Sequence, residues 1–252
     1  MERIKQIAIW SIAALLLFSL ASCVTNYTTQ YLQTRKNLPQ YSKKDYQWYV
    51  LKPNDQIAVR VLSINEDITR LFPSSSASSG QSGSGMSYKI YADSTVDLPF
   101  ISHLKIGGLT LEVANQVIEK KIQEFDKNAS VVIALNNDVF YIIGEAGKGQ
   151  FPIYKDKLTI FQALALAGDI RTNGDRGKIK VIRETSKGPV VKQFDIRSNS
   201  LLDSEYYYVY PNDIIYVSTA PGSFFRIESF SSLMSLVTTS VTFLVLVLNT
   251  IK

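Results

Sequence analysis

The stretch "VLKPNDQIAVRV", residues 50–61, joins a turn signal directly to a strand pattern. In Pro53-Asn54-Asp55, the proline fixes φ, the asparagine tolerates a positive φ, and the aspartate can bond the backbone two residues further on. After this turn, Ile57, Val59 and Val61 alternate with other residues, which is typical of a strand with a buried face. The stretch therefore predicts a tight turn that opens a sheet.

A second copy of this pattern lies near the end of the chain, in "YVYPNDIIYVS", residues 208–218. Here Pro211-Asn212-Asp213 precedes Ile215 and Val217, which again lie two residues apart. A turn followed by a strand is a common arrangement, and three matching letters can arise by chance. The repeat indicates a shared structural role only if each copy belongs to the sheet of a separate domain.

Composition excludes several classes of protein. The chain has 252 residues, enough for one or two domains with tails, and its single cysteine excludes an internal disulfide. A single histidine, His103, excludes a multi-histidine metal site and argues against a Ser-His-Asp triad; a surface or edge position suits it better. The net charge of +5 is mild and no basic run occurs, which argues against nucleic-acid binding.

The N-terminus has the features of a signal peptide, predicted over residues 1–22. Arg3 and Lys5 precede an apolar stretch, Ile7 to Leu20, that is too short for a full membrane span. The following Leu20-Ala21-Ser22-Cys23 resembles a bacterial lipobox, so Cys23 is predicted to carry covalent lipid such as palmitate. The alternative is an uncleaved signal anchor with an incidental cysteine.

Residues 224–251 are predicted to form a transmembrane helix. No charged residue occurs from Ser229 to Ile251, and 23 helical residues span about 34 Å. At 100° per residue, polar side chains gather on one side of this helix. They are Glu228, Ser231, Ser232, Ser235, Thr238, Thr239, Thr242, Asn249 and Thr250.

This polar stripe has two interpretations. A ring of such helices could enclose water, which makes Glu228, Ser231, Ser235, Thr238, Thr239, Thr242 and Asn249 candidate pore-lining residues. Serine and threonine also mediate dry packing between helices in membranes. Leu246 interrupts the stripe and Phe243 flanks it, so both interpretations stay open.

Between the two ends, the pattern predicts a tether and a first domain. Residues 23–46 are polar and tyrosine-rich and are predicted to be a tether; residues 47–137 are predicted to form an α+β domain. Its expected strands are 48–51, 57–64, 88–92, 96–101 and 130–136. Thr110 is expected to cap a helix that runs to about Phe125, with one apolar face formed by Leu111, Ala114, Val117, Ile118, Ile122 and Phe125.

A second domain is predicted over residues 138–220. "LTIFQALALAGDI" predicts a short helix in which Thr159 and Gln162 form a capping box and Gly168 provides the C-terminal cap. Strands are expected at "VFYIIG", "KIKVIRE", "VVKQFDI" and "DIIYVS". Strands around one short helix predict a small β-grasp-like α+β module.

Signals for catalysis are weak. The small polar stretch 73–87 lacks the pattern of a phosphate loop, and the glycines at 144, 147 and 149 do not open a helix, as a dinucleotide site requires. Asp93, Asn136–Asp138 and Asp195 supply carboxylates, but nothing predicts two of them in one cleft, and all fit turns. We therefore predict no catalytic residue, no metal and no cofactor besides the lipid.

Taken together, the chain resembles the bacterial outer-membrane polysaccharide export lipoproteins, which secrete capsule or exopolysaccharide. "YVLKPNDQIAVRV" and "IYADSTVDLPFISHLKIGGLTLEVANQVIEKKI" are similar to the export domain of that family, with Asn54 and Ser94 where the family usually has glycine. "VFYIIGEAGKGQFPI", "LTIFQALALAGDI" and "VYPNDIIYVS" resemble its soluble-ligand-binding (SLBB) β-grasp domain. The likeness covers residues 47 to 219.

The resemblance implies a fold, a function and partners. It implies a homo-oligomeric ring, often of eight subunits, with C-terminal helices forming an α-helical barrel through the outer membrane and domains in the periplasm. The substrate would be a polysaccharide and the partner an inner-membrane co-polymerase, often a tyrosine autokinase. The alternative is a periplasmic ligand-binding or scaffold lipoprotein that the C-terminal helix only anchors. A glycan hydrolase ranks last.

Overall fold

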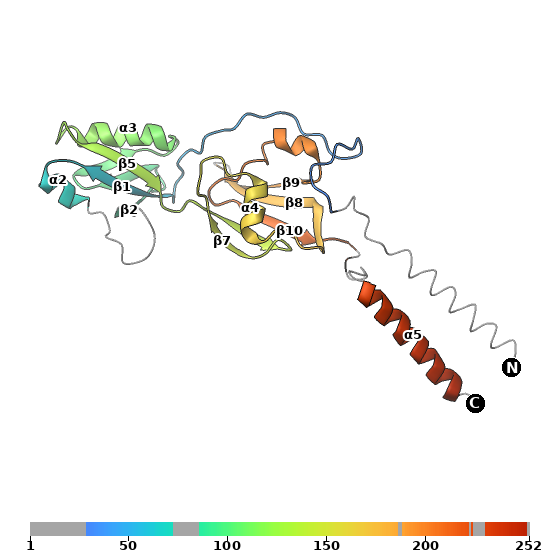
Figure 1. Cartoon of the computed structure of the whole chain (residues 1–252). Helices are drawn as coiled ribbons and strands as arrows, with labels where there is room; N and C mark the ends of the chain where they lie inside the picture. Colours follow the sequence, from blue (N-terminus) through green and yellow to red (C-terminus); the bar gives the residue numbers. More distant parts are fainter. Residues whose placement is uncertain (1–28, 73–85, 186–187, 222, 224–229, 251–252) are drawn as a thin grey trace.

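The computed structural model describes residues 29–72, 86–185, 188–221, 223 and 230–250. The fold is mixed α+β, with two domains built around separate sheets. A helix, α5 (Phe230–Thr250), follows the second domain and extends away from both (Figure 1). Each domain has its own cluster of buried apolar side chains.

The first domain is organised around β1 (Gln56–Leu62). This strand pairs antiparallel with both β2 (Met86–Lys89) and β5 (Ser130–Leu135), giving the sheet order β2-β1-β5. The alternating residues of the opening stretch, Ile57, Val59 and Val61, are almost completely buried. They pack with the helix α3 (Leu111–Ile122), which lies over this sheet in Figure 1.

Helix α3 (Leu111–Ile122) begins where the sequence predicts. The Thr110 side chain accepts a hydrogen bond from the backbone N–H of Val113, and Ala114, Ile118 and Ile122 are buried. Leu111 and Val117 are half-buried against the same core. The helix ends three residues before the predicted end, and Phe125 is 56% exposed rather than part of the buried face.

Between β2 and α3 lies a β-hairpin that the sequence pattern does not reveal. The predicted single strand 96–101 is two antiparallel strands, β3 (Thr95–Leu98) and β4 (Ile101–Lys105). Phe100 has a φ of 62°, so the chain reverses at Pro99-Phe100. The exposed side chain of His103 lies on β4, and its backbone N–H donates to Asp97 Oδ1.

One other expectation for this domain is wrong, and one of its helices was not predicted. The predicted strand 48–51 is only an isolated bridge between Val50 and Thr110. A short helix that was not predicted, α2 (Glu66–Leu71), follows β1 and is capped by the Asn65 side chain. Ile68 and Leu71 pack against the core, but two apolar residues in a six-residue helix give too short a pattern to indicate it.

The second domain contains a five-stranded mixed sheet in the order β7-β6-β10-β8-β9. The strands are β6 (Val139–Gly144), β7 (Gly149–Pro152), β8 (Gly174–Thr185), β9 (Gly188–Phe194) and β10 (Ile214–Thr219). Strands β6 and β10 are parallel, and the other pairs are antiparallel. Residues 199–203 form a short 3-10 helix, η2 (Asn199–Asp203).

Helix α4 (Ile160–Ala167) crosses between β7 and β8, and both predicted caps are confirmed. Thr159 and Gln162 exchange the two hydrogen bonds of a capping box, and Gly168 is left-handed with a φ of 98°. Ile160, Ala163 and Leu164 bury one face of the helix. Local capping signals therefore positioned this element correctly.

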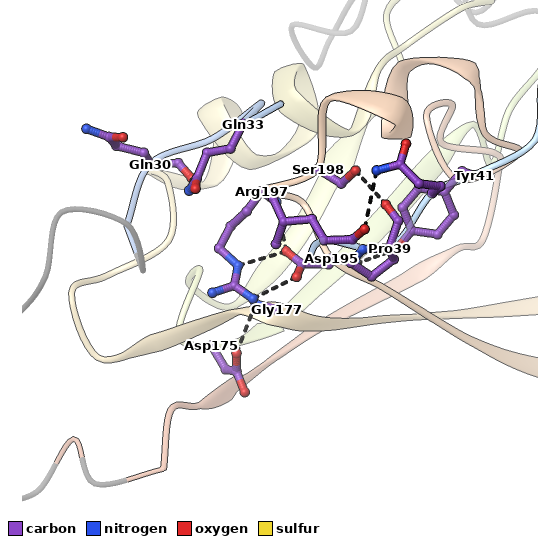
Figure 2. A network of polar contacts seen from close by, with 11 residues as sticks. Gln30, Gln33, Pro39, Tyr41, Asp175, Gly177, Asp195, Arg197 and Ser198 are labelled. Carbon is purple, nitrogen blue, oxygen red and sulfur yellow. Dashed lines mark hydrogen bonds and ion pairs between the residues drawn. The ribbon is translucent and has the colours of Figure 1, made fainter. Parts of the chain in front are cut away.

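The segment between residues 29 and 46 lies along the second domain (Figure 1), although its composition predicts a tether. Gln33 forms a parallel bridge with Ser198, and the Tyr41 hydroxyl accepts a hydrogen bond from the backbone N–H of Asp195. Figure 2 shows this contact beside the ion pair of Asp195 and Arg197. The described part of the segment is therefore held by the second domain.

Candidate functional site

The two Pro-Asn-Asp turns have the same geometry. Asn54 and Asn212 are both left-handed, with φ of 74° and 65°. Asp55 Oδ2 accepts from the Lys52 N–H at 2.8 Å, and Asp213 Oδ2 accepts from the Tyr210 N–H at 2.9 Å. Each aspartate thus bonds the backbone three residues earlier, whereas the sequence pattern predicts a bond two residues further on.

Both turns lie at the junction of the two domains. Lys52 Nζ donates to the carbonyl oxygen of Glu184 in β8, 2.8 Å away, and Asp55 Oδ1 accepts from Asn137 in the interdomain connection. From the other side, the Tyr210 hydroxyl donates to the Gln47 carbonyl oxygen at 2.8 Å. The repeated Pro-Asn-Asp turn therefore precedes a strand in each domain, and its neighbouring residues also link the two domains.

The carboxylates considered for catalysis have different surroundings. Asp93 accepts bonds from the backbone and hydroxyl of Thr95, which lowers its pKa and makes it a turn residue. Asp195 binds the Arg197 guanidinium at 2.7 and 2.9 Å. Both carboxylates thus bond to neighbouring residues, and the described residues include no group of three or more His, Cys, Asp or Glu placed to hold a metal.

Asp138 differs from these turn residues. Its Oδ1 is buried and has no hydrogen-bond partner among the described residues. Burial, with smaller effects from Asp156 and Asp55, raises the pKa of Asp138 to about 7. The sequence pattern predicts only a turn role for Asp138, because nothing in the local pattern shows what the second domain places around it.

The candidate pore residues that the structure describes lie on α5. Ser231, Ser235, Thr238, Thr239 and Thr242 are exposed, and Asn249 lies in the last turn of the helix. Glu228 and the proposed lipidation site Cys23 lie outside the described residues. Among the helices that the structure describes, none combines the length and apolarity needed to cross a bilayer.

Hydroxyl groups on α5 bond to the backbone of their own helix. Thr239 Oγ1 donates to the Ser235 carbonyl oxygen at 2.7 Å, and Thr242 Oγ1 donates to the Thr238 carbonyl oxygen at 2.8 Å. Thr238 and Ser240 make similar bonds. Because the hydroxyl protons are satisfied internally, these side chains can face either water or an apolar neighbour.

An aromatic group at the domain junction was not expected from the sequence. The Tyr46 ring stacks on Tyr210, with centroids 5.8 Å apart and planes 6° apart, and meets the edge of Trp48 at 5.3 Å. Tyr46 also donates its hydroxyl to the carbonyl oxygen of Asp156. The richness of tyrosine near residue 46 is a signal for this group, but two of the partners of Tyr46, Tyr210 and Asp156, lie more than 100 residues away in the sequence.

Comparison with known protein families identifies the first of the two domains. Residues 43–136 match the family described as polysaccharide biosynthesis/export protein, and the match spans the described elements from β1 to β5. This part of the chain is therefore similar to the polysaccharide export family, as the resemblance predicted. The match supports a general role in polysaccharide export.

Proposed function

We propose that the chain is one subunit of a polysaccharide translocon of the bacterial outer membrane. Copies of the chain form a ring, the two α+β domains lie in the periplasm, and the α5 helices line the pore. The export domain at residues 43–136 is the observation that carries this proposal. The mixed sheet and single helix of the second domain support its assignment as a β-grasp module of the soluble-ligand-binding type.

The surface of α5 supports association of the helices. Leu236, Phe243 and Val247 fall on one face of the helix and are 38–69% exposed in the single chain. An apolar surface of this kind needs lipid or another protein to cover it. In a ring, each helix turns part of its surface to its neighbours and to water, so it need not be apolar on every side.

Hydroxyl side chains suit the interior of such a pore. Ser235, Thr238 and Thr242 lie on a face separate from Leu236 and Phe243. Their oxygen atoms keep lone pairs that can accept bonds from water or from sugar hydroxyls. Few charges in the pore would allow a hydrated glycan to slide without being held.

The proposal extends to the anchor and the partners. Acyl chains on Cys23 would hold the periplasmic side of the ring at the outer membrane. An inner-membrane polysaccharide co-polymerase, such as a tyrosine autokinase, would deliver the glycan. The transport itself is passive conduction and requires neither a catalytic residue nor a cofactor beyond the lipid.

One observation favours a second candidate function. Since hydroxyls of α5 are satisfied within the helix, they do not require water beside them. The alternative is a periplasmic ligand-binding or scaffold lipoprotein in which α5 serves only as a second anchor. This alternative predicts a monomer or dimer and no conduction.

Substitution of the hydroxyl face separates these functions. Ser235→Leu combined with Thr242→Leu should reduce polysaccharide at the cell surface at least severalfold, because two apolar side chains per subunit narrow and dry the pore. Val241→Leu, outside the hydroxyl face, is the matched control and should leave export unchanged. Normal export by the double variant at a normal protein level would show that the face serves for packing.

A further inference from the structure

A cavity of about 320 Å³ lies at the junction of the two domains. The first domain contributes residues around Trp48 and the start of α3, and the second contributes the loop after β7 and the turn before β10. Its volume is at the lower end of the range for small-ligand sites. The cavity is separate from the hydroxyl face of α5, to which the proposed function assigns conduction.

Aromatic side chains form much of the cavity lining. Tyr46, Trp48, Tyr49 and Tyr210 all contribute to it, and the Trp48 side chain is 59% exposed. Tyr46 is fixed by stacking on Tyr210 and by its hydroxyl bond to Asp156, so the group is organised without a ligand. The negative face of an aromatic ring attracts the partly positive C–H groups on the face of a sugar ring.

Carboxylates supply the polar contacts. Glu112, Asp138 and Asp156 line the cavity. Asp138 Oδ1 itself is buried and has no partner among the described residues, so a ligand would meet the other parts of this side chain. The hydroxyl group of a sugar is a donor, and a carboxylate is the strongest acceptor among the side chains.

The charges indicate which sugars fit. Three carboxyl groups line the cavity, of which Asp138 is about half protonated at neutral pH, and Lys157 lies beside it, with Nζ 5.5 Å from the centre of the Trp48 ring. The excess of negative charge disfavours uronic acids and other anionic sugars. From these observations we infer that the junction cavity binds a neutral sugar residue, with Trp48 as the stacking platform and Asp138 as a hydroxyl acceptor.

This inference rests on the proposed function, because it assigns the junction cavity to the exported polysaccharide. A site at the junction would hold the glycan through both domains at once, so that binding would also stabilise their relative arrangement. The site would bind the glycan weakly before the glycan enters the pore. The ring and the conduction through α5 do not depend on it.

The test uses the protein purified in mild detergent, with Trp10→Phe so that Trp48 is the only tryptophan whether or not the predicted signal peptide has been removed. The probes are maltohexaose, cellohexaose and chitohexaose as neutral chains and hexagalacturonate as an anionic one. Titration followed by Trp48 fluorescence and by calorimetry should show saturable binding of at least one neutral probe. Hexagalacturonate should bind at least tenfold more weakly.

Variants connect the binding to the cavity. Trp48→Ala should weaken the neutral probe roughly five- to tenfold, and Asp138→Asn severalfold, while Trp48→Phe should retain most of the affinity in calorimetry. Tyr154→Ala, which removes an equally exposed aromatic ring outside the cavity, is the matched control. Circular dichroism of each variant shows that the domains remain folded.

Three results would overturn the inference: no neutral probe binds, hexagalacturonate binds more tightly, or Trp48→Ala binds normally. Ring assembly and surface polysaccharide are measured on the same variants. If the ring exports polysaccharide normally but binds none of the probes, the junction cavity is not a sugar-binding site, and the proposed function still holds. If the unmodified protein forms no ring and supports no export, the proposed function is contradicted.

Discussion

Arg183 and Asp213 form a bidentate ion pair in the second domain, with Nε 2.8 Å from Oδ1 and Nη2 2.7 Å from Oδ2. Asp213 is 1% exposed, and its Oδ2 also accepts from the Tyr210 N–H. The guanidinium lies over the Tyr210 ring at 4.3 Å. One arginine thus supports the turn that leads into β10 and one of the aromatic rings at the domain junction.

Replacement of Arg183 should destabilise the folded state. Arg183→Met leaves a buried carboxylate without its partner, and the free energy of unfolding should fall by about 3 kcal/mol. Denaturation by urea, followed by circular dichroism, measures the change. Arg70→Met, which breaks the exposed pair with Glu66, is the matched control and should change stability by less than about 0.5 kcal/mol. Equal effects from the two substitutions would contradict the assigned role of Arg183.

Asp138 should make the stability depend on pH. Because its folded pKa is raised to about 7, the folded state binds more protons than the unfolded state between about pH 4 and pH 7. Stability from this group is therefore present at low pH and is lost as the pH rises through 7. Asp138→Asn should raise the free energy of unfolding at pH 8 by about 1–2 kcal/mol and flatten its pH profile. An unchanged profile would show that Asp138 is ordinarily solvated.

Gly144, at the end of β6, lies where a side chain cannot be accommodated. It has a φ of 95°, and a Cβ atom there would lie 2.1 Å from the Val217 carbonyl oxygen of β10. Gly144→Ala should therefore lower the free energy of unfolding by about 3 kcal/mol. Gly108→Ala, with a φ of 85° and open space around it, should cost about 1 kcal/mol. Similar values for both variants would mean that the close contact with β10 does not matter.

Helix α3 protects the free edge of β5. Glu119 Oε2 accepts from the Val131 N–H at 2.9 Å, and Asn115 Oδ1 accepts from the Ile133 N–H at 3.1 Å. Glu119→Ala combined with Asn115→Ala should cost about 2 kcal/mol and speed hydrogen exchange at these two amides. Lys120→Ala, on the exposed face of α3, should change neither. Unchanged exchange rates in the double variant would show that other groups protect the edge.

Sequence patterns predicted the elements whose signals are local. The turn residues Asn54 and Asn212 adopt the left-handed φ that the pattern requires, and α4 has both of its predicted caps. Ser94, which stands where the family usually has glycine, is left-handed too, with a φ of 69°. These features were predictable because a few neighbouring residues determine them.

The rest depends on contacts between distant residues. The sequence pattern predicts one strand where the β3–β4 hairpin lies, since Pro99-Phe100 contains no glycine or asparagine to indicate that the chain direction reverses. The segment 29–46 lacks a regular apolar period, yet it bonds to residues 195–203. The junction cavity combines several separate stretches of chain, and no local pattern indicates such an arrangement.

Copies of this chain should form a ring that conducts polysaccharide. The most direct test is to purify the full chain in mild detergent, measure the mass of the particle, and reconstitute it into liposomes loaded with a fluorescent neutral dextran. The account predicts a particle of several subunits and release of the dextran, reduced by Ser235→Leu with Thr242→Leu. A monomer or dimer whose liposomes retain the dextran would contradict it.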